Sequence, residues 1–151
     1  MDSLLIASHQ PPAELALRLG AAAGLGLLLG LERELRGKAA GLRTHMLVCL
    51  GSAAFLLVAL HIVHAESGDL GTSVDPSRVI QGVIGGVGFL GAGSIIQSRG
   101  SVHGLTTGAG IWIAGAVGLA CGFGDFVLAG LVTGFAVVIV VVLGFIERWL
   151  L

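Results

Sequence analysis

A short charged segment between two long apolar runs constrains the fold of this chain more than any other feature. Residues 30–45 read GLERELRGKAAGLRTH and contain four of the chain's eight Lys and Arg residues. The runs on either side lack the polar residues that a soluble helix or strand shows at regular spacing. Two membrane-spanning helices joined by a charged turn explain this pattern. The sequence therefore predicts an integral membrane protein.

The composition also favours a membrane protein over a soluble domain. Of the 151 residues, 55% are hydrophobic and 11% are charged, whereas about a quarter are charged in a typical soluble domain. The 26 glycines occur within apolar runs, where small residues let membrane helices approach closely. The formal net charge of −1 says nothing about nucleic acid, and we expect no nucleic-acid partner because no basic surface is available to bind one. No nucleophile–base pattern, Walker loop or metalloprotease motif is recognisable, so we expect no enzyme activity, no cofactor and no bound metal.

Five apolar stretches can be interpreted as helices of one all-α, polytopic membrane domain that covers residues 1–151. A hydrocarbon core of about 30 Å requires about 20 residues of helix, and the stretches are near that length. The predicted spans are residues 12–31, 44–64, 79–97, 105–121 and 125–146.

The basic residues are distributed unequally between the two sides of this topology. Arg18 and Arg78 fall on the side of the N-terminus, and the other six Lys and Arg residues fall on the opposite side. Cytoplasmic segments are enriched in Lys and Arg, so we expect the N-terminus outside and the C-terminus in the cytoplasm. The six are Arg33, Arg36, Lys38, Arg43, Arg99 and Arg148.

The first and second halves of the chain show a weak internal repeat. A shift of 63 positions aligns Gly30 with Gly93. It also aligns the Gly-Leu-x-Thr segment that ends at Thr44 with the one that ends at Thr107. The first pair of spans then corresponds to the second pair. Spans one and three run in the same direction, so the two copies form a parallel repeat of two-helix hairpins about an axis along the membrane normal.

The two Gly-Leu-x-Thr segments begin spans two and four at the predicted cytoplasmic face. Thr44 and Thr107 can cap helices whose first N–H groups lack partners. Two such helix starts, with Arg43 beside one of them, would form a weakly positive concavity suited to a carboxylate or phosphate group. Ordinary helix capping is the alternative interpretation.

Charged residues at the ends of span one are further candidates for a binding site. Glu32 and Arg33 end the first apolar run, and an ion pair between Glu32 and Arg43 would pin the hairpin, with Thr44, Thr106 and Thr107 around it. A cation or proton site is the sharper alternative, since charges near the membrane are usually paired or functional. Arg18 lies about two turns into span one, with Glu14 one turn earlier on the same face. It either extends outward to pair with Glu14 or lines a polar pathway.

Span three is unusually rich in glycine, which predicts close helix packing. A break in the helix between Gly88 and Gly93, with exposed backbone groups, is the alternative. Pairs of small residues four positions apart also exceed what packing within one copy requires, so we expect a homo-oligomer, with a dimer as the simplest state. The helix-packing candidates are Gly82, Gly86, Gly88, Gly91 and Gly93.

Several of these segments together resemble the membrane domain of the MgtC/SapB family, from about Arg18 to Gly122. The resemblance implies a bacterial inner-membrane protein of about five spans that is associated with adaptation to low magnesium. It covers the membrane domain alone, and we expect the soluble cytoplasmic domain of many members to be missing. Virulence-linked members often carry Asn at the position of Thr106 and Arg at that of His103. Because these residues differ here, the resemblance implies the general membrane role of the family and does not imply a virulence-type activity. The matching segments are GLERE (30–34), AGLRTH (40–45), GFLGAG (88–93) and GLTT (104–107), with Trp112 following.

These observations predict a non-enzymatic protein that acts by packing against itself and against another membrane protein. The alternative is a transporter or channel for Mg²⁺ or another small ion that moves between the two repeats. Against transport, no pair of carboxylates lies at mid-depth in the predicted spans, where a hard cation would need oxygen ligands.

Overall fold

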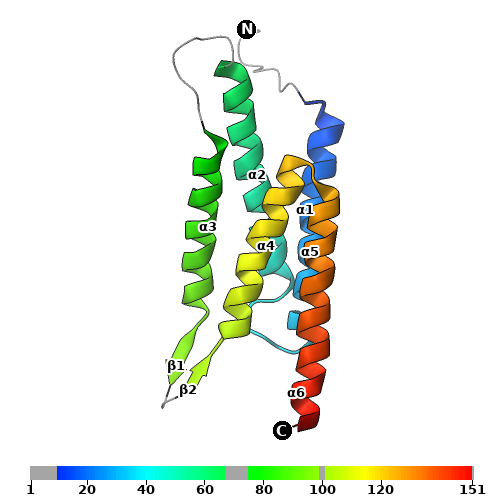
Figure 1. The fold of residues 1–151 in the computed structure, drawn as a ribbon, viewed down its shortest axis with the longest axis vertical. Helices are drawn as coiled ribbons and strands as arrows, with labels where there is room; N and C mark the ends of the chain where they lie inside the picture. Colours follow the sequence, from blue (N-terminus) through cyan, green and yellow to red (C-terminus); the bar gives the residue numbers. More distant parts are fainter. Residues whose placement is uncertain (1–9, 67–74, 99–100, 151) are drawn as a thin grey trace.

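In the computed structural model, residues 10–66, 75–98 and 101–150 are described, and they form a helical bundle with one short β-hairpin (Figure 1). The all-α class predicted from the sequence is therefore confirmed. The elements in order are α1 (Pro12–Leu35), α2 (Leu42–Glu66), α3 (Pro76–Gly93), β1 (Ile96–Ser98), β2 (Ser101–His103), α4 (Leu105–Phe123), α5 (Phe126–Val138), the π-helical segment η2 (Ile139–Leu143) and α6 (Gly144–Leu150).

Four helices in the described part of the chain are long and apolar enough to cross a membrane. The last is continuous through α5, η2 and α6, and α3 is a fifth helix that is shorter and carries Arg78 and Gln81 among its glycines. The helices run up and down side by side, with α3 at one edge (Figure 1). The chain is thus a polytopic membrane protein. The four spans are Pro12–Leu35, Leu42–Val63, Leu105–Phe123 and Phe126–Glu147.

Helix α1 extends four residues beyond the predicted span, through the charged residues to Leu35. Gly37 then ends it with a left-handed backbone, φ +60°. The Gly37 N–H donates to the Glu34 carbonyl at 3.0 Å, and the Lys38 N–H donates to the Arg33 carbonyl at 2.9 Å. This is the Schellman arrangement, which satisfies carbonyls that a helix end leaves free. It places Lys38 next to the last turn of α1.

The turn between α4 and α5 repeats this arrangement, and it lies between the predicted spans 105–121 and 125–146. Gly124 has φ +94°, and the N–H of Asp125 donates to the Ala120 carbonyl at 2.9 Å. The Asp125 carboxylate in turn accepts from the Leu128 N–H at 2.9 Å. One residue thus closes α4 and caps α5.

The connection between α3 and α4 differs from the prediction, which extended a helix to Gln97. Helix α3 ends at Gly93, and β1 pairs with β2 in antiparallel register, Ile96 opposite His103. Gly104 joins β2 to α4 at φ +92°, and a Cβ there would lie 2.0 Å from the Ser94 carbonyl oxygen. Glycine is therefore required at this position.

Helix α3 begins at a capped N-terminus. The Asp75 carboxylate accepts from the backbone N–H of Ser77 at 2.9 Å and from its hydroxyl at 2.7 Å. These hydrogen bonds lower the pKa of Asp75 because they stabilise the ionised form.

Small residues form the core of the bundle, and large apolar residues face outward. Ala22, Cys49, Ala114 and Cys121 are completely buried, whereas many leucines and phenylalanines are exposed along the helices. A Cβ at Gly118 would lie 2.2 Å from the Cys49 carbonyl oxygen, so α4 and α2 touch backbone to backbone. Membrane helices pack in this way because small residues allow close approach while lipid covers the large side chains.

The two helix pairs α1–α2 and α3–α4 run in the same order and direction, as the predicted repeat requires (Figure 1). Their connections differ, since an irregular loop joins α1 to α2 and a β-hairpin joins α3 to α4. The relation between the two copies stays a prediction.

Candidate functional site

A cluster of three charged side chains lies near the C-terminal end of α1. Arg33 Nε donates a hydrogen bond to Glu32 Oε2 at 2.5 Å. Arg36 Nε lies 2.5 Å from the other carboxylate oxygen, Glu32 Oε1. The side chains of Glu32 and Arg33 are 14% and 8% exposed, and that of Arg36 is 22% exposed. One carboxylate therefore holds two arginines in a largely desolvated place, and the cluster keeps a net positive charge.

Beside this cluster is a cavity of about 690 Å³, which we call the hairpin-end cavity. It lies at the end of the bundle that holds the α1–α2 loop, the β-hairpin and α6 (Figure 1). Its apolar wall includes Ile139, Val140 and Leu143 of the π-helical segment, a rare geometry that is frequent at functional sites. Its polar lining is Arg33, Arg36, Lys38, Ser94, His103, Thr106, Thr107 and Glu147.

A smaller cavity of about 340 Å³ lies deeper, between α1, α4 and α5. Glu32, Arg33 and Thr106 line it, together with His45 of α2. The His45 ring is almost completely buried, and its Nδ1 donates to the Gly41 carbonyl at 2.9 Å. Glu32 and Arg33 thus lie between a polar mouth and an apolar interior.

The predicted ion pair between Glu32 and Arg43 is not formed, which corrects the sequence interpretation. Arg33 and Arg36 take both oxygens of Glu32, and Arg43 is exposed at the start of α2. The physical reason is the rotation of α2. A helix turns by about 100° per residue, so the buried His45 places Arg43, two residues earlier, on the far side of the helix.

The predicted threonine caps are also absent, because α2 and α4 begin at Leu42 and Leu105. Thr44 and Thr107 therefore occupy the third helical position. The first N–H of α2, on Leu42, donates to Glu34 Oε2 at 3.0 Å. At α4 the cap residue is Gly104, which has no side chain to offer. Thr106 and Thr107 line the hairpin-end cavity and Thr44 does not.

Arg18 lies at the opposite end of the bundle and belongs to a different cluster. It pairs with Glu14, as the snorkelling interpretation predicts, and its Nη1 also donates to the Gly122 carbonyl at 2.7 Å. Arg18 therefore binds the last turn of α4 to α1. Its position and partners indicate a structural role.

The glycines of α3 divide into two groups. Gly91 approaches Gly108 of α4, where a Cβ would lie 3.0 Å from the Gly108 carbonyl oxygen. At the other candidates, Gly82, Gly86, Gly88 and Gly93, an added Cβ would have nothing within 4 Å, so each has open space where a side chain would be. Helix α3 continues through Gly88 to Gly93 without the break that was the alternative to close packing.

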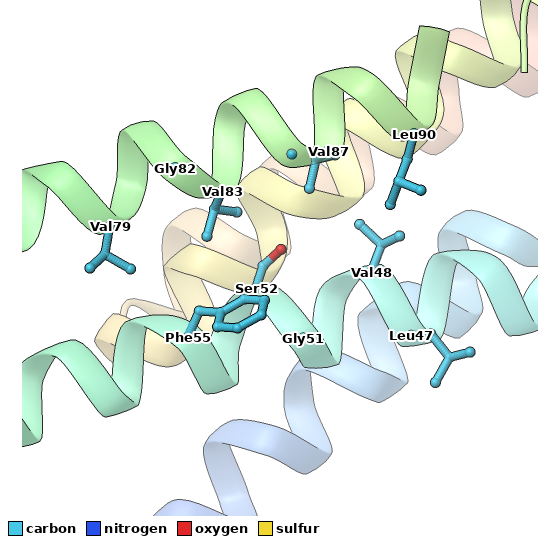
Figure 2. A pocket seen from close by; sticks show the side chains of 11 residues that line it. Leu47, Val48, Gly51, Ser52, Phe55, Val79, Gly82, Val83, Val87 and Leu90 are labelled. Atoms are coloured by element: carbon cyan, nitrogen blue, oxygen red, sulfur yellow. The ribbon is translucent and has the colours of Figure 1, made fainter. Parts of the chain in front are cut away.

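Between α2 and α3 is an apolar groove of about 620 Å³, which we call the α2–α3 groove. Figure 2 shows Val79, Val83 and Val87 of α3 pointing toward α2, with Gly82 between them at the α3 wall. The opposite wall, on α2, is Leu47, Val48, Gly51, Ser52 and Phe55.

Three residues that shape the two cavities are not among the site residues predicted from the sequence. Arg36 lies four positions after Glu32, the spacing at which helical side chains pair, so this signal was present. Lys38 follows the glycine that ends α1, which is also visible in the sequence. His45 had no local signal, because its burial depends on how α2 is rotated against α1 and α4.

The fold and this site define a polytopic helical membrane protein with a basic cavity at one end of its bundle. The model of the MgtC family matches residues 19–149, and the chain belongs to that family. It is similar to the protein named "Putative magnesium transporter YhiD" of Escherichia coli K12, with 42% identity over 77% of this chain and 54% of the relative.

Two relatives named "Protein MgtC" are also similar to this chain. That of Brucella abortus is 39% identical over 86% of this chain and 51% of the relative. That of Salmonella typhimurium LT2 is 41% identical over 73% of this chain and 44% of the relative. The chain thus spans about half the length of the curated relatives it matches. No solved structure matches it.

Proposed function

We propose that this chain acts non-enzymatically in a bacterial inner membrane, in adaptation to low magnesium, by binding other membrane helices. The word magnesium in the name of the Escherichia coli relative supports the physiological setting. The basic residues Arg33, Arg36, Lys38 and Arg43 all lie in the last turns of α1, the α1–α2 loop and the start of α2. This asymmetry supports an orientation with the C-terminus in the cytoplasm.

The α2–α3 groove is the observation that carries the proposal. Gly82 and Gly86 lie one turn apart on α3 and have open space where side chains would be. Two membrane helices approach closely where such small residues face each other. A groove of this kind, apolar and glycine-lined, fits a transmembrane helix.

The occupant that we propose is α3 of a second copy. A two-fold axis brings the same patch of two copies together, so a single glycine face on α3 supplies both halves of the contact. Gly82 and Gly86 of each copy would then meet at the crossing point.

Cysteine cross-linking in native membranes tests this contact. With Cys49 and Cys121 replaced by alanine, we expect Gly82→Cys to form a covalent dimer under mild oxidation. A cysteine at Val127, an exposed site on α5, is the control and should not. Equal cross-linking at both sites, or a protein that is monomeric in lipid nanodiscs, would contradict the dimer.

The same face can be tested by function. We expect Gly86→Leu to abolish the dimer and to fail in complementing growth at low magnesium in a strain that lacks the protein. Gly130→Leu is the matched control, since Gly130 on α5 also has nothing within 4 Å. Complementation by a monomeric Gly86→Leu variant would show that the groove binds a different helix or lipid.

Transport of Mg²⁺ is the competing function, which the name of the Escherichia coli relative suggests. Proteoliposomes that contain an indicator for Mg²⁺ separate the two. We expect Mg²⁺ to enter these proteoliposomes as slowly as it enters protein-free vesicles. If Mg²⁺ enters faster with the wild type and with the Gly130→Leu control, the proposal is overturned in favour of a transporter.

A further inference from the structure

We propose that the hairpin-end cavity binds a phosphate group. The proposal is independent of the dimer, because the cavity and the α2–α3 groove have different linings. The ligand class is an oxyanion with at least two oxygens free, as in a phosphate ester or inorganic phosphate.

The charge of the lining favours an anion. Arg33, Arg36 and Lys38 contribute three positive charges from α1 and the loop after it. Glu32 pairs with the two arginines, and Glu147 is an exposed carboxylate at the α6 wall. The sum, three positive against two negative, leaves one net positive charge around the cavity.

Arg33 supplies donors that the protein does not use. Its side chain is more than nine-tenths buried, and its hydrogen bond to Glu32 uses Nε. Among the residues that the structure describes, its two terminal nitrogens have no acceptor. Neither is among the buried side-chain atoms that lack a partner, so both remain accessible to a ligand. The planar fork of a guanidinium fits two phosphate oxygens.

The start of α4 adds backbone donors on the other side of the cavity. Gly104, Leu105, Thr106 and Thr107 all line it, and the cap residue provides no side-chain acceptor. The first N–H groups of a helix lack partners and lie at the positive end of its dipole. At α2 the equivalent N–H is taken by Glu34, so α4 is the helix start that remains open.

The surroundings allow either a lipid or a soluble source for the phosphate. The apolar wall of the π-helical segment continues from Leu143, which ends that segment, to Phe145 of α6, and both side chains are exposed. A phospholipid headgroup entering from the bilayer and a soluble phosphate entering from the mouth would present the same oxygens. The experiment therefore has two arms.

Thermal unfolding of the purified protein in dodecyl maltoside micelles, which contain no phosphate, measures both. In the first arm, phosphatidylglycerol is added to the micelles. In the second, inorganic phosphate replaces chloride at equal ionic strength. We expect one arm to raise the unfolding temperature of the wild type. Stabilisation in the first assigns the site to a lipid headgroup, and stabilisation in the second assigns it to a soluble phosphate.

The variants identify the cavity as the place of binding. Lys38→Gln removes an exposed cation from the lining and should weaken apparent binding about tenfold, the effect of one charge-assisted contact. Arg36→Gln should do the same, and its basal unfolding temperature shows whether it folds. Arg43→Gln is the matched control, since Arg43 does not line the cavity. Stabilisation in neither arm, or an equal loss in Arg43→Gln, would overturn the proposal.

Discussion

Replacing Glu32 by glutamine tests the charge cluster most directly. The change keeps the shape of the side chain and removes the charge that holds Arg33 and Arg36, each 2.5 Å away. Breaking a buried ion pair costs about 3–5 kcal/mol because the remaining charge is unmatched. Arg33 is 8% exposed and bears this cost, whereas Arg36, at 22%, is nearer to water. We therefore expect a loss of about 2–4 kcal/mol in the free energy of unfolding.

Unfolding by sodium dodecyl sulfate in mixed micelles measures this loss, and a double-mutant cycle assigns it. Glu32→Gln and Arg33→Gln should couple by about 1–3 kcal/mol, since they share one interaction. Glu32→Gln and Arg43→Gln should be additive within about 0.5 kcal/mol. Coupling to Arg43 as strong as to Arg33 would refute the geometry of the cluster and restore the pair that the sequence suggested.

Three further predictions concern the bundle itself. Gly118→Ala should lower the free energy of unfolding by about 1–3 kcal/mol, because its Cβ would meet the backbone of α2 at 2.2 Å; Gly88→Ala, in open space, should not. Arg18→Met should speed hydrogen exchange at the α4–α5 turn, where the guanidinium binds a carbonyl, and unchanged exchange would contradict that role. Asp75→Ala should speed hydrogen exchange in the first turn of α3, because the cap is lost. In the wild type, the protection of these amides from exchange should be present above about pH 4 and should be lost as the pH falls through the lowered pKa of Asp75.

The helices were predictable because a membrane span leaves a strong signal in sequence. Runs of about 20 apolar residues have few alternatives, and the charged segment at residues 30–45 separates the first two. The ends of the helices were less predictable. Residues 32–35 stay helical although three of them are charged, because Glu32 pairs with Arg36 at the helix end and Gly37 ends the helix shortly afterwards.

The partners of the charged residues depended on information that hydropathy does not contain. The sequence placed Glu32, Arg33, Thr106 and Thr107 near one end of the bundle, and the structure brings them to neighbouring cavities. The rotation of α2 about its axis decided that Arg43 faces away. That rotation is set by packing against α1 and α4, where glycine backbones make the contact, and no local pattern reports it.

The distribution of polar groups bears on how this protein works. Arg18 and its partners lie at one end of the bundle, and the Glu32 cluster lies at the other. Between them α1, α2 and α4 touch so closely that a Cβ at Gly26 would lie 2.8 Å from the His45 carbonyl oxygen of α2. Contacts of this kind leave no room for a hydrated cation at the points where α1 and α4 cross α2.

A magnesium ion keeps several waters and needs oxygen ligands in near-octahedral geometry. The described residues contain no group of three or more His, Cys, Asp and Glu side chains suited to hold a metal. The α2–α3 groove has a lining that is apolar apart from Ser52. Such a surface stabilises a helix or an acyl chain better than a hydrated ion, because burying an unpaired charge there carries a large desolvation cost. This favours the interaction role that we propose for the groove over transport along it.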